Sequence, residues 1–272
     1  LLILLIFLSI FSIAVIRPKI QGDSVSYAQT IDVLRGQPPL KDFIPNRIIT
    51  TYFGLQVIRF VDIPFNNIKI SWLLVNSIWY LLMGLFFYSI LKRLGENSRI
   101  SFISTLFLVT NYAAVTSGLS YLMDIGGWTF YVISLYFSLL FLQQKKLNFL
   151  WLSALALGFG GLFKESALLG YVVIFGIVIF VNWKNWKETF KQLIFTGVIV
   201  FGPFILINIY SLFKYNFTYF TWLQAQGVYV YKSRLIEYIK NFGSRYNFGW
   251  FLLLQGLYLI FNPWQQKKHQ HI

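Results

Sequence analysis

Residues 68–91 read IKISWLLVNSIWYLLMGLFFYSIL, with Lys69 as the one charged side chain. A helix needs about 20 apolar residues to cross a bilayer, so this stretch predicts a membrane span. The whole chain agrees, because 57% of its 272 residues are hydrophobic and only 12% are charged. A soluble domain carries about a quarter charged residues. This composition excludes a soluble enzyme, and its 20% aromatic content excludes disorder.

Apolar stretches of this kind recur along the chain. They predict an all-α, polytopic transmembrane helix bundle of about eight spans, forming a single domain over residues 1–272. The expected spans are Leu1–Ile16, Ile68–Leu91, Ile100–Gly118, Ile125–Leu142, Leu147–Phe163, Glu165–Val181, Leu193–Phe213 and Phe248–Phe261. The fifth and sixth are separated only by Lys164, so they predict either a tight hairpin or one bent element. Because the first span starts at Leu1 without a methionine, we expect the sequence to be a truncated piece of a longer chain.

Charge predicts the orientation of these spans. The 23 basic and 9 acidic residues give a net charge of +14, and the bases cluster in short loops. Such loops face the cytoplasm in membrane proteins, so we read the charge as a topology signal and expect no nucleic-acid partner. The predicted cytoplasmic bases are Lys92, Arg93, Arg99, Lys145, Lys146, Lys184, Lys187, Lys191, Lys267 and Lys268. Two long segments, 17–67 and 214–247, then face the opposite side, as do the acids Asp23, Asp32, Asp42, Asp62, Asp124, Glu165 and Glu237.

The first long segment has the pattern of two interfacial helices. Residues 24–35 place Val25, Ala28, Ile31 and Leu34 on one helical face, and Gly36 with two prolines ends that helix. Residues 45–61 begin with a proline, which is favoured in the first turn, and form a second amphipathic stretch. Helices of this kind lie in the membrane interface with the apolar side down.

The segment Gly22-Asp23-Ser24-Val25-Ser26-Tyr27-Ala28, shortly after the first span, resembles the first extracytoplasmic loop of the GT-C glycosyltransferase superfamily. That group includes the protein O-mannosyltransferases (glycosyltransferase family 39) and the lipid A aminoarabinose transferases. GLFKESALLG, residues 161–170, is similar to a second family feature, a lysine at the outer end of a membrane hairpin. Where several of these families have Asp-Glu in the first loop, this chain has Asp23-Ser24.

The resemblance implies a transferase in the plasma membrane. It would move a sugar from a polyprenyl-phosphate donor, with inversion, to an acceptor hydroxyl on the extracytoplasmic face. The acceptor, whether protein, lipid or glycan, is left open, and membrane lipids are the other expected partners. Asp23 would take the proton from the acceptor hydroxyl. The alternative for Asp23 is a helix N-cap, which is common for aspartate.

The leaving phosphate needs cations, and Lys164 and Arg47 are the candidates. Alternatively, Lys164 would extend to the interface or pair with Glu165, and Arg47 would contact anionic lipid head groups. Tyr27 and Glu165 are the expected substrate-binding residues under the resemblance. Asp124 would be a second acid or a helix N-cap before Ile125.

Cofactor chemistry is constrained by composition. The chain has no cysteine, and its two histidines, His269 and His271, lie in the tail. This excludes thiolate metal sites and histidine clusters in the body of the chain. We therefore assign no metal ligands and no certain cofactor, and metal dependence is left open, because two acids in separate loops permit a divalent cation without requiring one. The alternative function is a transporter or flippase, which would place charged groups near the bilayer midplane.

Overall fold

The computed structural model describes residues 1–40 and 43–225, and this part of the chain is helical without strands. The helices are α1 (Leu2–Ile16), α2 (Asp23–Leu34), α3 (Asn46–Phe65), α4 (Ile68–Arg93), α5 (Ser98–Val109), α6 (Tyr112–Thr116), α7 (Asp124–Gln144), α8 (Leu147–Gly161), the 3-10 helix η1 (Glu165–Gly170), α9 (Tyr171–Asn182), α10 (Trp186–Tyr215) and α11 (Tyr219–Ala225). The predicted all-helical class is confirmed. The predicted eighth span, 248–261, and most of segment 214–247 lie outside the described residues.

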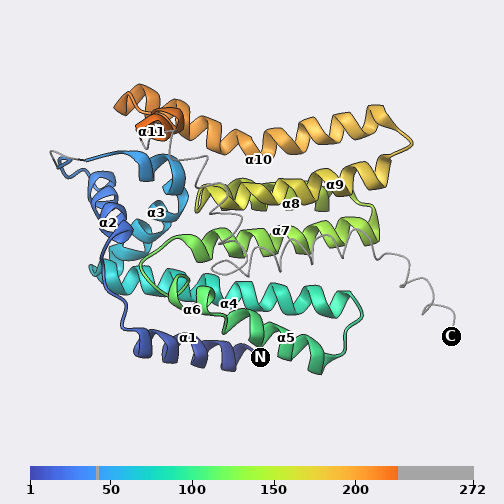
Figure 1. Cartoon of the computed structure of the whole chain (residues 1–272), viewed down its shortest axis with the longest axis horizontal. Coiled ribbons are helices and arrows are strands. Elements are labelled where there is room, and N and C mark those ends of the chain that lie inside the picture. Colours follow the sequence, from blue (N-terminus) through green and yellow to red (C-terminus); the bar gives the residue numbers. More distant parts are fainter. Residues whose placement is uncertain (41–42, 226–272) are drawn as a thin grey trace.

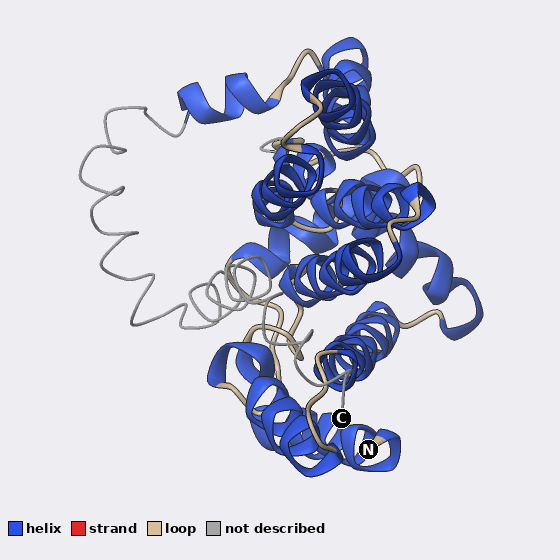
Figure 2. Cartoon of the chain, turned by 90° about the vertical axis from the view of Figure 1, so that its right-hand side faces the viewer, coloured by secondary structure: helices blue, strands red, loops and turns tan. Residues whose placement is uncertain are grey.

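The long helices lie side by side, and Figure 2 shows them nearly end-on. Between them lies a core of buried apolar side chains from α4, α7, α8 and α9, including Tyr80, Val132, Leu157 and Ile174. Within the described residues, five helical segments are long and apolar enough to cross a membrane: Asn46–Phe65, Ile68–Arg93, Asp124–Gln144, the combined Glu165–Asn182, and Trp186–Tyr215. Helices α1, α5 and α8 are apolar but shorter.

The two ends of the bundle differ in charge: basic residues gather at the turns of one end, and most of the described acids lie at the other. The turns from α4 to α5, α7 to α8 and α9 to α10 share one end (Figure 1), where the acids are Glu96 and Glu188. The bases at or beside these turns are Lys92, Arg93, Arg99, Lys145, Lys146, Lys184, Lys187 and Lys191. The other described acids, Asp23, Asp32, Asp62, Asp124 and Glu165, belong to elements at the opposite end. The arrangement therefore follows the polarity that the positive-inside rule predicts.

Apart from shifted ends, such as the earlier start of α10 at Trp186, the predicted spans call for comment at two places. The stretch 100–118 is not one helix: α5 ends at Val109, and Asn111 starts α6 by accepting a hydrogen bond from the Ala113 amide (2.9 Å). An asparagine side chain that satisfies a free amide favours a helix start over a continued helix, which explains the break. At the second place, the hairpin alternative is correct, because the chain reverses between α8 and η1.

Helices α2 and α3 lie across the end of the bundle that carries most of the acids (Figure 1). Both were predicted, and α2 begins within one residue of the expected start. The predicted apolar face of α2 is partly wrong, because Val25 is 41% exposed whereas Tyr27 is completely buried beside Ile31. The helix is therefore rotated so that its tyrosine faces the protein.

Helix α3 is kinked at Thr51, whose φ and ψ angles are −141° and 22°. Beyond this kink, the amides of Phe53 and Gly54 donate to the carbonyl of Leu162 at the α8–η1 turn (3.1 and 3.4 Å). A kink frees amides from their intrahelical acceptors, and a buried amide needs another partner. Helix α3 and the hairpin turn are therefore joined through the main chain.

Gly126 lies where the start of α7 touches the hairpin turn. A Cβ atom at this position would lie 2.3 Å from Phe163 Cδ1, and Phe163 is only 1% exposed. We expect Gly126→Ala to lower the unfolding free energy by about 1–3 kcal/mol, because the ring has little room to move. The matched control is Gly202→Ala in α10, where a Cβ meets no atom within 4 Å. Melting temperatures in detergent should fall for Gly126→Ala alone; equal values would show that this contact is loose.

Candidate functional site

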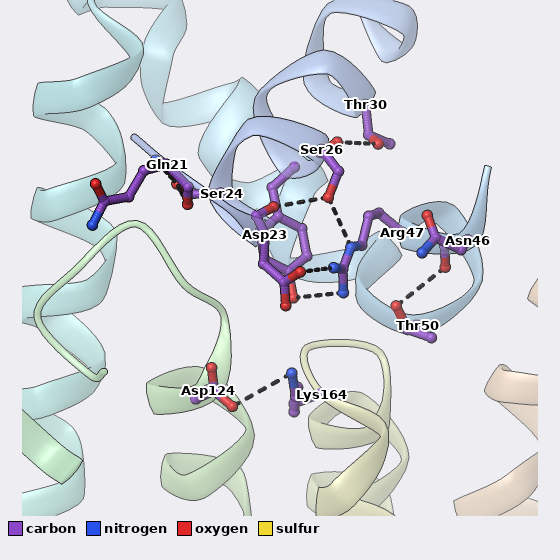
Figure 3. A network of polar contacts seen from close by, with 11 residues as sticks. Gln21, Asp23, Ser24, Ser26, Thr30, Asn46, Arg47, Thr50, Asp124 and Lys164 are labelled. Atoms are coloured by element: carbon purple, nitrogen blue, oxygen red, sulfur yellow. Dashed lines mark hydrogen bonds and ion pairs between the residues drawn. The ribbon is translucent and has the colours of Figure 1, made fainter. Parts of the chain in front are cut away.

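Asp23 and Arg47 form an ion pair between α2 and the first turn of α3 (Figure 3). The distance from Arg47 Nη2 to Asp23 Oδ1 is 2.7 Å. Gly22 is the N-cap residue of α2, and Asp23 is the first residue of the helix. The Asp23 side chain makes no capping hydrogen bond to the helix amides. The alternative of a capping aspartate is therefore wrong. The Asp23 side chain is 64% exposed, whereas that of Arg47 is 13% exposed, so the acid is open to an incoming group and the cation lies behind it.

Each guanidinium nitrogen of Arg47 has a partner in the first turns of α2. Besides the Asp23 contact of Nη2, Nε donates to Ser26 Oγ (3.0 Å) and Nη1 donates to Tyr27 Oη (3.2 Å). Ser26 Oγ in turn donates to the Asp23 carbonyl (2.8 Å). Residues 23, 26 and 27 share one helical face, which is why a single arginine reaches all three.

Tyr27 is fully buried beneath this arginine. Its ring lies 4.5 Å from the Arg47 guanidinium carbon, in a cation–π contact, and packs edge-on against Trp72 of α4 (centroids 6.0 Å apart). Burial raises the pKa of Tyr27, so the hydroxyl stays protonated at neutral pH. The expected substrate residue Tyr27 thus has no exposed surface and contacts Arg47 instead.

Lys164 and Asp124 form a second ion pair, between the hairpin turn and the start of α7, with Nζ and Oδ1 3.5 Å apart (Figure 3). Both side chains are about one-fifth exposed, at 21% and 20%. Burial lowers the pKa of Lys164, but interactions with Asp124, Tyr27 and Glu165 together raise it by more, so the ammonium stays charged. Lys164 pairs with Asp124 rather than with its neighbour Glu165, and Asp124 makes no capping hydrogen bond as the first residue of α7.

The position of Lys164 is set by its neighbours. Phe163 is buried against the rings of Phe53, Trp79 and Phe130, with centroids 5.1 to 5.4 Å apart. A Cβ on Gly127 would lie 2.8 Å from Lys164 Cβ, so the glycine allows the turn to approach α7 closely. The packing of Phe163 and the close approach at Gly127 together fix the backbone position from which the Lys164 side chain extends.

The loop that precedes Asp124 is held by α4. Asn76 Nδ2 donates to the carbonyls of Ser120 (2.6 Å) and Leu122 (2.9 Å), and Trp72 Nε1 donates to Leu122 as well (3.4 Å). Trp72 therefore contacts both Tyr27 and the loop leading to Asp124. Trp72 thus links the ring beneath Arg47 to the loop that precedes Asp124.

The two ion pairs lie in one neighbourhood around the Tyr27 hydroxyl. Lys164 and Arg47 lower the pKa of Tyr27 and the acids Asp124 and Glu165 raise it, although burial has the largest effect. Figure 3 shows both ion pairs in one close-up view, with Lys164 pointing towards the same region as Arg47 and Asp23. Asp23, Arg47, Asp124 and Lys164, predicted from separate stretches of sequence, are thus brought together at one end of the bundle (Figures 1 and 3).

Glu165 has one carboxylate oxygen, Oε2, that is buried and without a hydrogen-bond partner among the described residues. Because that oxygen is covered by protein, a substrate hydroxyl does not reach it in this conformation, and the expected substrate-binding role of Glu165 stays a prediction. Within residues 1–40 and 43–225, no three acids come close enough together to hold a metal ion. Asp23 and Asp124 pair with the basic side chains of Arg47 and Lys164. A bound divalent metal ion stays a prediction.

Sequence reasoning missed Ser26, Thr51 and Trp72. Ser26 follows Asp23 by three residues and precedes Tyr27, and this helical spacing alone would have placed it beside them. Trp72 lies inside an apolar span and nothing in its surroundings distinguishes it. The kink at Thr51 likewise has no local signal, since Asn46–Phe65 reads as a continuous helix apart from Pro64 near its end.

Comparison with protein families matches residues 56–208 to the dolichyl-phosphate-mannose-protein mannosyltransferase family. The match covers more than half of the chain and contains Asp124, Lys164 and Glu165, whereas Asp23, Tyr27 and Arg47 precede it. No curated protein and no solved structure matches. The matched family and the bundle of apolar helices agree with the resemblance read from residues 22–28 and 161–170. This chain belongs to the dolichyl-phosphate-mannose-protein mannosyltransferase family, within the GT-C superfamily of membrane glycosyltransferases.

Proposed function

We propose that this glycosyltransferase moves a sugar from a polyprenyl-phosphate donor to a hydroxyl on the extracytoplasmic face, with inversion at the anomeric carbon. The observation that carries the proposal is one exposed carboxylate, Asp23, next to two largely buried cations, Arg47 and Lys164. The reaction requires one proton acceptor and a positively charged site for the leaving phosphate.

Asp23 has the role of general base in this proposal. The acceptor oxygen forms a bond to the anomeric carbon and its proton passes to a carboxylate oxygen of Asp23. An acceptor has to reach that oxygen, and the 64% exposure of the Asp23 side chain permits it. Asp124 fits this role less well, because its side chain is only 20% exposed and faces Lys164.

Arg47 and Lys164 would bind the donor phosphate. When the bond between the anomeric carbon and the phosphate oxygen breaks, the electron pair stays on that oxygen, and its negative charge is stabilised by nearby cations. The Lys164 ammonium is charged and held at the hairpin turn, at the same end of the bundle as Asp23. Partly buried cations act more strongly on a phosphate than solvated ones do.

The charge separation along the bundle supports the extracytoplasmic placement of this site. The basic turns lie at the opposite end from α2 and the hairpin turn, and basic turns face the cytoplasm. A polyprenyl-phosphate donor fits such a site because its chain stays in the bilayer while its phosphate lies at the interface. We propose the plasma membrane as the location and leave the sugar and the acceptor unassigned.

Transfer in liposomes tests this function against the transport alternative. Full-length protein is reconstituted with a radiolabelled polyprenyl-phosphate sugar, and loss of label from the lipid is followed over time. The expected result is protein-dependent transfer of label from lipid to an added acceptor or to water. Movement of the intact donor between leaflets without loss of label would overturn the proposal in favour of a flippase.

A further inference from the structure

The burial of Tyr27 raises the question of what a tyrosine does beneath the candidate phosphate-binding arginine. The side chain has no exposed surface, so it touches neither the acceptor substrate nor the lipid-linked sugar donor in this conformation. Its polar contact is the hydrogen bond from Arg47 Nη1, and its ring face is covered by the same guanidinium. The hydrogen bond and the cation–π contact both involve Arg47, so any effect of Tyr27 on binding would act through the position of this arginine.

The guanidinium of Arg47 is therefore fixed on several sides. Ser26 and Tyr27 accept from Nε and Nη1, Asp23 pairs with Nη2, and the Tyr27 ring lies against the guanidinium plane. A guanidinium has five N–H groups. Three partners take one each, and the remaining two belong to Nη1 and Nη2, the pair of nitrogens that binds phosphate oxygens in bidentate contacts.

We propose that Tyr27 is a positioning residue that holds Arg47 so that its two remaining N–H groups bind the donor phosphate while Arg47 still contacts Asp23. This inference rests on the proposed function for the identity of the ligand. A flexible arginine loses conformational entropy when it binds, whereas one already held in place loses less. The carboxylate and the phosphate site are then kept at a fixed separation by one guanidinium.

The placement of Tyr27 in the fold supports this role. Its ring is wedged edge-on against Trp72, which packs edge-on against Tyr121 (centroids 5.5 Å apart). Trp72 is itself completely buried. The ring that supports Arg47 is thus held by aromatic contacts between α2, α4 and the loop before Asp124, and it cannot tilt without moving them.

The test measures binding of sugar-free polyprenyl phosphate to the full-length protein in nanodiscs, followed by transfer kinetics with the sugar-bearing donor. Tyr27→Leu removes the ring and the hydroxyl and should weaken polyprenyl-phosphate binding about tenfold, the size of a partly desolvated cation–π contact. Tyr27→Phe keeps the ring and should lose about threefold. In transfer, the donor KM should rise by more than kcat falls.

A double-mutant cycle separates positioning from general loosening of the fold. If Tyr27 acts through Arg47, Tyr27→Leu should have no further effect on binding in an Arg47→Ala background. The matched control is Ile31→Val, which trims another fully buried side chain of α2. This variant should bind polyprenyl phosphate within about twofold of the wild type.

Three outcomes would overturn the inference. Additive losses in the double variant would show that Tyr27 acts independently of Arg47, and equal losses for Tyr27→Leu and Ile31→Val would show a structural role alone. In both cases wild-type transfer would remain and the proposed function would stand. A wild-type protein that neither binds polyprenyl phosphate nor transfers sugar would overturn the inference together with the proposed function.

Discussion

Replacing Asp23 by asparagine is expected to slow sugar transfer about 100- to 10,000-fold, the usual contribution of a general base. Asparagine has nearly the same shape but accepts no proton at neutral pH. The variant should fold, since Arg47 keeps its bonds to Ser26 and Tyr27. Single-turnover release of label from the donor measures the effect, and binding of polyprenyl phosphate should remain.

Asp32→Asn is the matched control for this variant. Asp32 lies on the same helix, its side chain is 55% exposed, and its pair with Arg35 at 3.4 Å is a surface contact. Such contacts contribute about 0–1 kcal/mol, so transfer should stay within about twofold of the wild type. Unchanged transfer in Asp23→Asn would disprove its role as base and direct the search to Asp124.

Replacing Lys164 by methionine is expected to weaken binding of the donor phosphate about 10- to 100-fold. The estimate corresponds to the loss of one charge-assisted hydrogen bond. Methionine keeps the unbranched shape of the side chain, so packing of the hairpin turn is preserved. Stability should fall too, by about 1–3 kcal/mol, because the Asp124 carboxylate loses its partner while about one-fifth exposed. Polyprenyl-phosphate binding and thermal melting report the two effects separately.

The double variant Lys164→Met with Asp124→Asn distinguishes a functional lysine from one that only neutralises its neighbour. Removing both charges leaves no unpaired carboxylate, so melting should return towards the wild-type temperature. Donor binding should stay weak, because no ammonium is present. Recovery of binding and transfer in the double variant would show that Lys164 serves only to compensate Asp124.

Much of the helical layout could be predicted from composition and periodicity. The span over residues 68–91 became α4 with nearly the same bounds, because apolar length alone determines such helices. The prediction of one span over 100–118 was wrong. Averaged over a window, hydropathy hardly registers a single polar residue such as Asn111, yet its side chain caps a new helix. The start of α10 was expected too late, because Asn185 accepts from the Glu188 amide and begins the helix within the basic loop.

The candidate site was predictable as a set of residues but not as a set of contacts. Asp23 stood out through the family resemblance of residues 22–28, and Lys164 because it is a lone charge between two apolar stretches, where an ionisable side chain is costly. The partners did not follow from sequence: Lys164 pairs with Asp124 rather than Glu165, and Tyr27 faces inward where Val25 was expected. Those outcomes depend on how α2 and α7 are rotated, and packing across helices far apart in sequence decides that.

The main-chain link from Phe53 and Gly54 to the Leu162 carbonyl has a consequence for how this chain tolerates change. Every residue except proline carries a backbone amide, so most substitutions at 53, and any at 162, keep the atoms that form the link. Gly54 is different, because a Cβ atom there would lie 2.8 Å from Phe163 Cδ1 and 2.9 Å from Met123 Sδ. We expect a saturation mutagenesis map to accept many residues at 162, mainly large apolar residues at 53, whose ring packs against Phe163, and almost none at 54.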